Sequence, residues 1–516
     1  MTQGETRDNS KRVSDQSDTN SSNTTNGNIR IFSDLEYSSL SLSRLQEKTA
    51  ESSRMQDSNQ LGKLSIDQLI NSTHDQIYRS PMDGSTTNTE TKTGPEQKVY
   101  PAEKQHSPTE QQKEPTAPEQ KEKQVPAEQR KGIDTSVPFV DITPEQASKL
   151  LDTPTGKDLP PIAERFEKDA LDKLGPLAQA TIYVSNDVSK AGIPPGAPTY
   201  RSINQALDRA PAGSVIKVMP GTYNERVSLS EKQSNISLIT DRDNPAVISG
   251  GGFRITSGAH DIQIRNFDVR NFSGQEAGIR VDGTNINNIT IAGNNVHDAR
   301  NAEGIAVYGR GGAGVSNVNL IGNRVHNLKL SQLEAMPVNG NVQNFRVEGN
   351  SGYNLDNLFI DVIGGEGNGG SKDQPRGGVI AFNYADGISS IKNPSYGEYS
   401  SAGIYSDAGS YLDIYGNYVR NSDFGVELGS EHGGLNSSHI QLHNNIIEKS
   451  ITWLKLGYKG GVDNIAVKDN LVLNNDLADI ERGGPQSSSV RIDGNIRAAD
   501  RGHITRIPSI IAAKFY

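Results

Sequence analysis

The sequence predicts a parallel β-helix, a solenoid of short strands, on the strength of a spaced repeat in its second half. The signature apolar-x-Gly-Asn-x-apolar recurs along the 516-residue chain, and its apolar residues alternate as in strands. Its three clear and five weaker copies centre on Asn294, Asn323 and Asn417, and on Asn350, Asn383, Asn445, Asn470 and Asn495. The steps between these asparagines are 29, 27, 33, 34, 28, 25 and 25 residues. Such a period is typical of one supersecondary unit per coil.

A second alternating segment in each coil supports the same fold. Side chains on opposite faces of a strand alternate, so one set is predicted to point inward: Ile279, Ile305, Leu358, Ile404, Val426 and Leu454. A first outward column would then hold Arg280, Ala306, Phe359, Tyr405, Glu427 and Lys455. A second outward column would hold Asp282, Tyr308, Asp361 and Asp407. The repeated asparagines themselves are expected to stack and hydrogen-bond from coil to coil as scaffold.

Four regions follow from composition along the chain. Residues 1–135 are polar and carry a degenerate Pro-Glu-Gln-Lys array, which predicts a disordered region with a linker and a short helix over 61–70. Residues 136–180 are expected to form a helical appendage on the open end of the solenoid, with one helix from Pro144 and another over 162–173. The β-helix is predicted over 181–500, and 501–516 would form a C-terminal tail or cap.

The start of the predicted solenoid carries a family resemblance. Ser202-Ile203-x-x-Ala206-Leu207-x-x-Ala210-Pro211 is an amphipathic helix, and Ile216-x-Val218-x-Pro220-Gly221-Thr222-Tyr223-x-Glu225-x-Val227 follows it. These runs resemble the start of the pectate-lyase-like, right-handed parallel β-helix superfamily, which includes pectin methylesterases and many polysaccharide lyases. The resemblance implies a right-handed solenoid of about ten coils whose first coil is capped by the helix. No catalytic set of these enzymes transfers residue by residue, because their motifs are missing here.

Composition excludes several functions. The net charge of −10 argues against nucleic acid as a partner, and the absence of cysteine excludes disulfides and thiolate sites. No apolar run is long enough to span a membrane. The first residues lack the features of a signal peptide. We therefore expect a monomer that is secreted or displayed by a leaderless route, with a cytoplasmic location as the alternative.

The candidate site lies where the repeat has its two overlong steps. Those steps enclose Asp361 and Asp407, and Glu427 and Lys455 follow on the next coils. Nearby carboxylates shift each other's pKa, bind a cation or act as an acid/base pair. We predict Asp361, Asp407, Glu427, Lys455 and Arg376 as catalytic residues. Asp361, Asp407 and Glu427 would be the oxygen ligands of a Ca²⁺ ion, if one is bound.

The side chains around this site suit a sugar chain. Aromatic rings can stack on sugars, and cations can neutralise uronates. The predicted substrate-binding residues are Phe359, Lys372, Tyr405, Glu431, His432 and Tyr458. We expect an enzyme that cleaves an acidic polysaccharide by β-elimination. The alternatives are a glycoside hydrolase on the same scaffold and a non-catalytic solenoid that binds glycans or serves as an adhesin.

Overall fold

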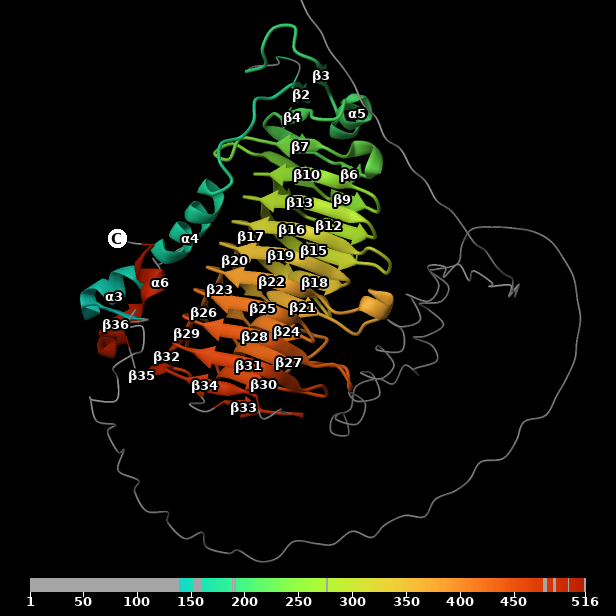
Figure 1. Ribbon diagram of the computed structural model, residues 1–516. Helices are drawn as coiled ribbons and strands as arrows, with labels where there is room; N and C mark the ends of the chain where they lie inside the picture. Colours follow the sequence, from blue (N-terminus) through green and yellow to red (C-terminus); the bar gives the residue numbers. More distant parts are fainter. Residues whose placement is uncertain are drawn as a thin grey trace, which may run out of the picture. The chain divides into compact units, whose positions relative to one another are not determined.

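The chain folds into three long sheets in which strands from successive coils lie side by side (Figure 1). The computed structural model describes residues 139–151, 159–187, 189, 192–274, 277–476, 480–485, 489–499 and 501–514. The predicted disordered region 1–135, with its helix over 61–70, lies outside these described residues. The chain visits each sheet once per coil with parallel strands, which confirms the predicted right-handed parallel β-helix.

The first sheet has 13 strands. In spatial order they are β3 (Thr199–Tyr200), β2 (Ile182–Val184), β4 (Val215–Val218), β7 (Ile236–Ile239), β10 (His260–Arg265), β13 (Ile286–Ala292), β16 (Val315–Ile321), β19 (Val342–Glu348), β22 (Arg376–Ala381), β25 (Ser410–Tyr415), β28 (Ser437–His443), β31 (Val462–Lys468) and β34 (Arg491–Asp493).

The second sheet has 11 strands and begins just after the repeated asparagines. Its strands are β35 (Ile496–Ala498), β32 (Leu471–Leu473), β29 (Ile446–Glu448), β26 (Tyr418–Arg420), β23 (Tyr384–Ile388), β20 (Ser351–Leu355), β17 (Arg324–Lys329), β14 (Asn295–Arg300), β11 (Asp268–Arg270), β8 (Ala246–Ser249) and β5 (Gly221–Tyr223).

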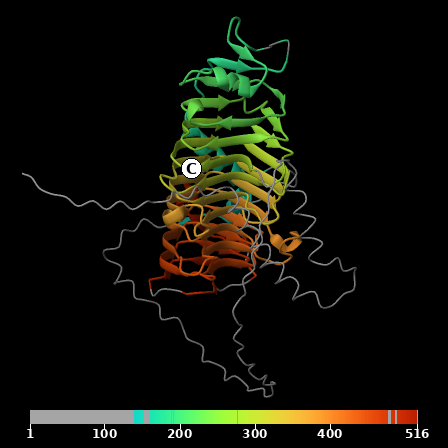
Figure 2. The same cartoon turned by 90° about the vertical axis from the view of Figure 1, so that its right-hand side faces the viewer.

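The third sheet has 10 strands and carries the candidate site. Its strands are β33 (Glu481–Arg482), β30 (Thr452–Leu456), β27 (Phe424–Gly429), β24 (Ala402–Asp407), β21 (Ile360–Ile363), β18 (Met336–Gly340), β15 (Glu303–Gly309), β12 (Ala277–Gly283), β9 (Gly252–Thr256) and β6 (Arg226–Leu229). Figure 2 shows the strands stacked along the axis of the solenoid.

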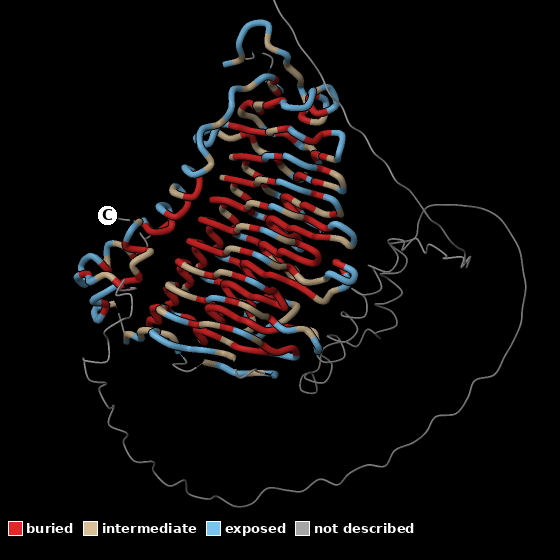
Figure 3. Tube along the Cα trace, viewed as in Figure 1, coloured by how far each residue is buried: buried red, intermediate tan, exposed pale blue. Residues whose placement is uncertain are grey.

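The core lies inside the coils, where each sheet contributes its inward side chains (Figure 3). In the third sheet the pairing aligns one inward column: Ile279, Ile305, Met336, Ile360, Ile404, Val426 and Leu454. All of these side chains are buried. Ile360, and not Leu358 as predicted, is therefore the inward residue of its coil.

The repeated asparagines form a buried ladder at the bend between the first and second sheets. In each step the Asn side-chain Nδ2 donates to the Oδ1 of the next Asn, for example from Asn350 to Asn383 over 3.0 Å. The same Oδ1 also accepts from the backbone N–H of Asn350 over 2.9 Å. The ladder runs from Asn294 to Asn495, so the predicted scaffold role of these residues is confirmed.

The remaining elements cover the solenoid at one end and along one flank. Helix α5 (Ile203–Arg209) packs Ile203, Ala206 and Leu207 into the core at the first coils. Helices α3 (Pro144–Leu151) and α4 (Pro161–Asp172) occur near the predicted positions, but α4 packs against β16 and β19 on the flank. The expectation that this appendage closes the open end is therefore wrong.

The C-terminal segment joins the same flank. Strand β36 (Arg506–Pro508) pairs antiparallel with β1 (Phe139–Asp141), and the short helix α6 (Ser509–Ala512) follows it. The described residues also include four 3₁₀ turns: η2 (Glu231–Gln233), η3 (Gly370–Lys372), η4 (Ser390–Lys392) and η5 (Arg501–His503). No helix among the described residues is both long enough and apolar enough to cross a membrane.

Candidate functional site

The candidate site is an outward column of the third sheet. Strand pairing aligns Pro337, Asp361, Tyr405, Glu427, Lys455 and Glu481 on six successive strands. A second outward column, one step along the strands, aligns Asn339, Ile363, Asp407 and Gly429. Asp361 and Asp407 therefore lie on adjacent strands but in different columns. Strand geometry separates their Cα atoms by about 8 Å along this diagonal.

This register corrects two predictions. We expected Phe359 to share a column with Tyr405, and Asp361 to lie directly beside Asp407. Instead Asp361 pairs with Tyr405, and the Phe359 ring is fully buried in the core against Gly352. Phe359 therefore cannot stack on a substrate. The predicted register was shifted by two residues, which kept Asp361 on the outward face but placed it in the wrong column.

The acidic side chains of the column are buried although they face outward. Asp361, Tyr405, Asp407 and Glu427 are 2%, 3%, 3% and 4% exposed. Two of their polar atoms, Asp361 Oδ1 and the Tyr405 hydroxyl, have no hydrogen-bond partner among the described residues. A buried polar atom without a partner costs about 1–3 kcal/mol. Such atoms are therefore expected where a ligand completes the hydrogen bonding.

Other carboxylates surround the pair. Burial, and then the charges of Glu334, Asp407, Glu431 and Glu366, raise the pKa of Asp361 well above its usual value. Burial and the charge of Glu431 raise the pKa of Asp407 in the same way. Asp407 Oδ1 accepts a hydrogen bond of 2.7 Å from the Glu431 backbone N–H, which favours its charged form. Asp361 therefore holds its proton in preference to Asp407.

Glu427 and Lys455 form an ion pair in the same column. Lys455 Nζ lies 2.9 Å from Glu427 Oε1, and it also lies over the rings of Phe424 and Tyr458 at 4.5 and 5.2 Å. Burial outweighs the charge of Lys455 and raises the pKa of Glu427 to about 7. The predicted residues Glu427, Lys455 and Tyr458 are thus brought together, with the Tyr458 side chain well exposed.

Two loops extend from the strands of this column. The first, residues 364–375, follows β21, and the second, residues 430–436, follows β27. They contact each other where Gly365 meets His432 and Leu435, and where Gln374 Nε2 donates to the Asn436 carbonyl over 3.2 Å. Beside this contact is an open hollow of about 640 Å³ lined by the first loop, Arg376 and Leu435. His432 and Glu431 thus belong to the loop beside Asp407, and His432 Nε2 is buried with no hydrogen-bond partner among the described residues.

The predicted cations of the first loop do not join the carboxylates. Arg376 lies on β22 in the first sheet, where it donates to Asn341 over 3.1 Å and to Gln343 over 2.9 Å. Lys372 is exposed in the wall of the hollow. Arg376 is thus hydrogen-bonded on a different sheet from Asp361 and Asp407, and its predicted catalytic role stays a prediction.

The three predicted Ca²⁺ ligands are not grouped together, and the calcium site stays a prediction. Among the residues that the structure describes, no three Asp, Glu, His or Cys side chains are grouped so that they could hold a metal ion. Tyr405 lies between Asp361 and Glu427 in the column, which keeps these two carboxylates about two strand spacings apart.

Two carboxylates of the site were missed in the sequence. Glu334 precedes β18, a strand with no Gly-apolar signature, and so this strand of the coil was not predicted. Glu366 lies in the Gly-rich insertion, where it accepts from Asn339 Nδ2 over 2.8 Å. The sequence interpretation of this insertion used its glycines and cations. Glu366 itself was the signal that could have indicated a further carboxylate at the site.

Comparison with known proteins finds one related sequence and several solved structures of similar fold, and it assigns no activity to this chain. No family model matches the chain. A curated relative, the uncharacterized protein YwoF of Bacillus subtilis strain 168, is 32% identical over 314 residues. The match covers 55% of this chain and 66% of YwoF, so the chain spans slightly less than two thirds of its relative.

The solved structures that resemble the chain have low identity. Pectate lyase Pel9A is 16% identical with a TM-score of 0.43, over 66% of this chain and 84% of its own. Alginate lyase from Paenibacillus sp. strain FPU-7 is also 16% identical, with a TM-score of 0.39 over 56% and 95%. The family 28 exopolygalacturonase of Yersinia enterocolitica is 14% identical, with a TM-score of 0.39 over 59% and 69%. These scores carry no argument about what this chain does, and its β-helix is defined by the strand pairing described above.

Proposed function

We propose that the chain is a glycoside hydrolase that uses Asp361 and Asp407 as its pair of catalytic carboxyl groups. The observation that supports this most directly is Asp361 itself, a buried carboxyl group whose Oδ1 lacks a partner among the described residues and whose pKa is strongly raised. Glycoside hydrolysis requires one carboxylic acid that keeps its proton near neutral pH, together with a second, ionised carboxylate.

The environments of the two residues suggest their roles. Asp361, the more readily protonated, would donate a proton to the oxygen of the leaving sugar. Asp407, whose charged form is favoured by the Glu431 N–H, would activate a water molecule or attack the anomeric carbon. Tyr405 lies beside Asp361 in the column, and its hydroxyl, which has no partner in the part of the chain that the structure describes, could bond a sugar oxygen or the Asp361 carboxyl group.

Hydrolysis fits this geometry better than the β-elimination that the sequence favoured. Elimination from a uronate needs a cation to neutralise the sugar carboxylate and a base to remove the adjacent proton. Lys455 is paired with Glu427, and Arg376 is hydrogen-bonded in another sheet. The site itself is rich in carboxylates, which would repel a uronate placed directly on it.

One observation favours a second function, that of a non-catalytic glycan-binding module. Asp361, Tyr405, Asp407 and Glu427 are each less than 5% exposed, so a sugar reaches them only if the structure around them changes. The hollow beside the loop of residues 364–375 could hold a glycan without chemistry. In either case we propose that the chain acts on or binds extracellular glycans, as a secreted or surface-displayed monomer.

The decisive experiment is incubation of the purified chain with a panel of neutral and acidic polysaccharides. Hydrolysis releases new reducing ends without ultraviolet absorbance, whereas elimination gives unsaturated products that absorb. The proposal predicts reducing ends alone. Products that absorb ultraviolet light would show that the reaction is elimination and not hydrolysis. Binding to a glycan column without either product would favour the binding module.

A further inference from the structure

One aligned position of the first sheet has a left-handed backbone in coil after coil. Strand pairing puts these residues in register, and each has a positive φ. In chain order they are Asn235, Asp261, Asn288, Asn317, Asn344, Gly377, Tyr411, His439 and Asn464. Glycine, asparagine and aspartate accept this conformation most readily. The tyrosine, with a φ of 53°, is the exception, and exceptions of this kind cluster at functional sites.

Tyr411 on β25 and His439 on β28 use this position to form an exposed aromatic stack. Their ring centroids are 4.4 Å apart and the ring planes differ by 16°. Tyr411 is 60% exposed, the largest value for a large hydrophobic side chain in the described part of the chain. The rings are stacked along the direction in which the strands follow one another. The His439 ring therefore covers one face of the Tyr411 ring, and the other face is turned toward β22.

A second Tyr–His stack on the same two strands shows what packing alone requires. Tyr415 and His443 are stacked with centroids 5.3 Å apart, and neither has a left-handed backbone. The Tyr415 ring also packs edge-on against Phe382 at 5.4 Å, within the apolar cluster on the flank. Tyr411 is mostly exposed instead, so packing does not account for a tyrosine at its position.

The position next to Tyr411 in this column is open. It is occupied by Gly377 on β22, and Asn344 on β19 follows it. Apart from the neighbours of Gly377 in the chain, a Cβ atom placed there would have only Asn344 within 4 Å among the described residues, with Oδ1 nearest at 3.2 Å. Tyr411 and Asn344 lie two strand spacings apart, about 9.6 Å. This slot has room for one flat ring between the Tyr411 ring and the Asn344 amide.

A pyranose ring of a glycan matches the slot. When its hydroxyl groups are equatorial, the face of such a sugar carries C–H groups, which pack on the electron-rich face of an aromatic ring. The Asn344 amide offers a donor and an acceptor for hydroxyl groups at the edge of the sugar. A protein partner would need about 800 Å² of surface on each side, far more than two rings supply.

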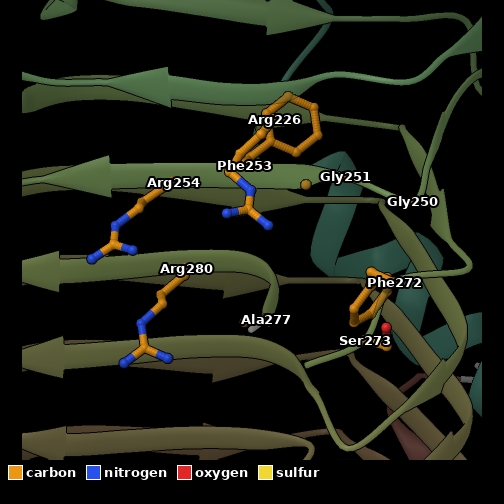
Figure 4. A pocket seen from close by; sticks show the side chains of 10 residues that line it. Arg226, Gly250, Gly251, Phe253, Arg254, Phe272, Ser273, Ala277 and Arg280 are labelled. Carbon is orange, nitrogen blue, oxygen red and sulfur yellow. The ribbon is translucent and has the colours of Figure 1, made fainter. Parts of the chain in front are cut away.

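The slot also lies beside the hollow described above. Arg376, which lines the hollow, directly precedes Gly377 in the chain. The hollow, at about 640 Å³, is in the size range of ligand sites. By comparison, the cleft around Arg254 at the other end of the third sheet (Figure 4) has a volume of about 20 Å³, too small for a sugar ring. A glycan that enters the hollow can thus place a neighbouring sugar on Tyr411.

We propose that Tyr411, His439 and the open position at Gly377 form a binding site for one pyranose ring of a glycan. The inference rests on the proposed function for the class of ligand. It adds a second place of contact, on the first sheet and separate from the carboxylates of the third. Tyr411 holds the sugar by stacking, and His439 supports the Tyr411 ring from its other face.

The test is calorimetric binding of neutral hexasaccharides to the full chain carrying Asp361→Asn, which under the proposed function prevents turnover. The probes are cellohexaose, laminarihexaose, maltohexaose and xylohexaose. Tyr411→Asn gives the position the commonest residue of its column, so the fold should keep its stability. We expect this variant to bind the best probe about tenfold or more weakly. Tyr411→Phe keeps the ring and should bind nearly as tightly as its parent.

Two further variants separate the slot from its surroundings. Gly377→Asn fills the slot and leaves Tyr411 in place, so it should also lose binding. Asn288→Ala shortens a side chain of the same column three strands away from Gly377, and should change nothing. Urea unfolding of each variant measures whether its fold is as stable as that of its parent.

The outcomes distinguish this inference from the proposed function. If Tyr411→Asn and Gly377→Asn bind every probe as tightly as their parent, or if the parent binds no probe, the stack is not a sugar site. If Tyr411→Phe loses as much as Tyr411→Asn, stacking is not the interaction and the inference fails. If Tyr411→Asn and Gly377→Asn lose binding while the wild-type chain releases no reducing ends from any glycan, the sugar site is upheld and the hydrolase assignment fails.

Discussion

At the scale of single residues, the site is defined by carboxyl groups in surroundings that disfavour their ionised form. Asp361 and Asp407 are buried among other acids, and the one nearby cation of the column, Lys455, is paired with Glu427. Burying a charge without a partner is costly, so this arrangement reduces the stability of the fold. A cost of this kind is common where a side chain serves chemistry rather than packing.

The raised pKa of Asp361 makes a prediction about stability and pH. Above its ordinary pKa of about 3.9, the unfolded chain releases this proton while the folded chain keeps it. Between this ordinary pKa and the raised pKa of the folded chain, the free energy of unfolding therefore falls as the pH rises, by at most about 1.4 kcal/mol per pH unit. Asp361→Asn carries no such proton, so the variant should be more stable than wild type at a pH of about 8 and similar to it at a pH of about 4.

Urea unfolding at several pH values measures this difference. The control is Asp413→Asn, because Asp413 is half-exposed on the first sheet and its pairing with His443 is remote from the site. A variant whose stability relative to wild type stays constant with pH would mean that Asp361 ionises normally in the folded chain.

The sequence identified these two aspartates but misjudged their surroundings. Alternation within the strands put Asp361 and Asp407 on the outward face, and the overlong repeats marked their coils. Whether that face is open or covered depends on the packing of segments outside the repeat, which have no periodic signal. The sequence therefore predicted an exposed groove where the structure has buried acids beside a hollow.

At the scale of elements, the asparagine ladder sets the register of the coils. The side chain of an interior rung such as Asn383 accepts two hydrogen bonds and donates two, so its removal leaves partners on both sides unsatisfied. This is why the repeat can be read in the sequence while its chemistry is purely structural.

Asn383→Ala should lower the free energy of unfolding by about 2–3 kcal/mol, since it leaves buried groups of Asn350 and Val347 without partners. The matched control is Asn495→Ala at the half-buried end of the ladder, which should lose less than about 1 kcal/mol because truncation of this outermost rung lets water reach its partners Asn470 and Val467. Denaturant unfolding gives both values. Equal losses would show that the ladder does not contribute through buried hydrogen bonds.

The same scale explains the error in register. The run Asn357-Leu358-Phe359 resembles the Gly-apolar-x pattern of the other coils. The preceding strand of the sheet, β18, has the sequence Met-Pro-Val-Asn-Gly and lacks this pattern. A shift of two residues keeps the alternation of faces, so nothing in the pattern opposed it. Only the pairing of Ile360 with Ile404 settles which residue of the coil faces the core.

At the scale of the whole molecule, the two ends of the described chain meet on the flank of the solenoid. Strands β1 and β36 pair there, and helices α3 and α4 share an apolar cluster with Ile504, Ile507 and Ile511. Arg501 joins this segment to the second sheet, with its Nε 2.6 Å and its Nη2 2.8 Å from the carboxylate of Glu448. The sequence predicted the helices, but no pattern indicated that they would lie along the coils.

Arg501→Ala should destabilise the fold by about 3–5 kcal/mol, because it leaves the fully buried Glu448 without its charge partner. Arg501→Lys keeps the charge but loses the paired N–H donors, so its loss should be smaller. Thermal or urea unfolding measures the difference. If Arg501→Ala leaves the free energy of unfolding unchanged, the flank segment adds nothing to the stability of the coils.

The measurement that tests the account most directly compares the release of reducing ends by wild type, Asp361→Asn and Asp407→Asn on the best glycan of the panel. If these residues are the acid and its partner, each variant should lose about 100-fold or more of kcat/KM, while Asp413→Asn keeps full activity. Unchanged unfolding midpoints, or higher ones, would show that the loss is chemical. Full activity in Asp361→Asn would contradict the assignment of this carboxyl pair as the catalytic centre.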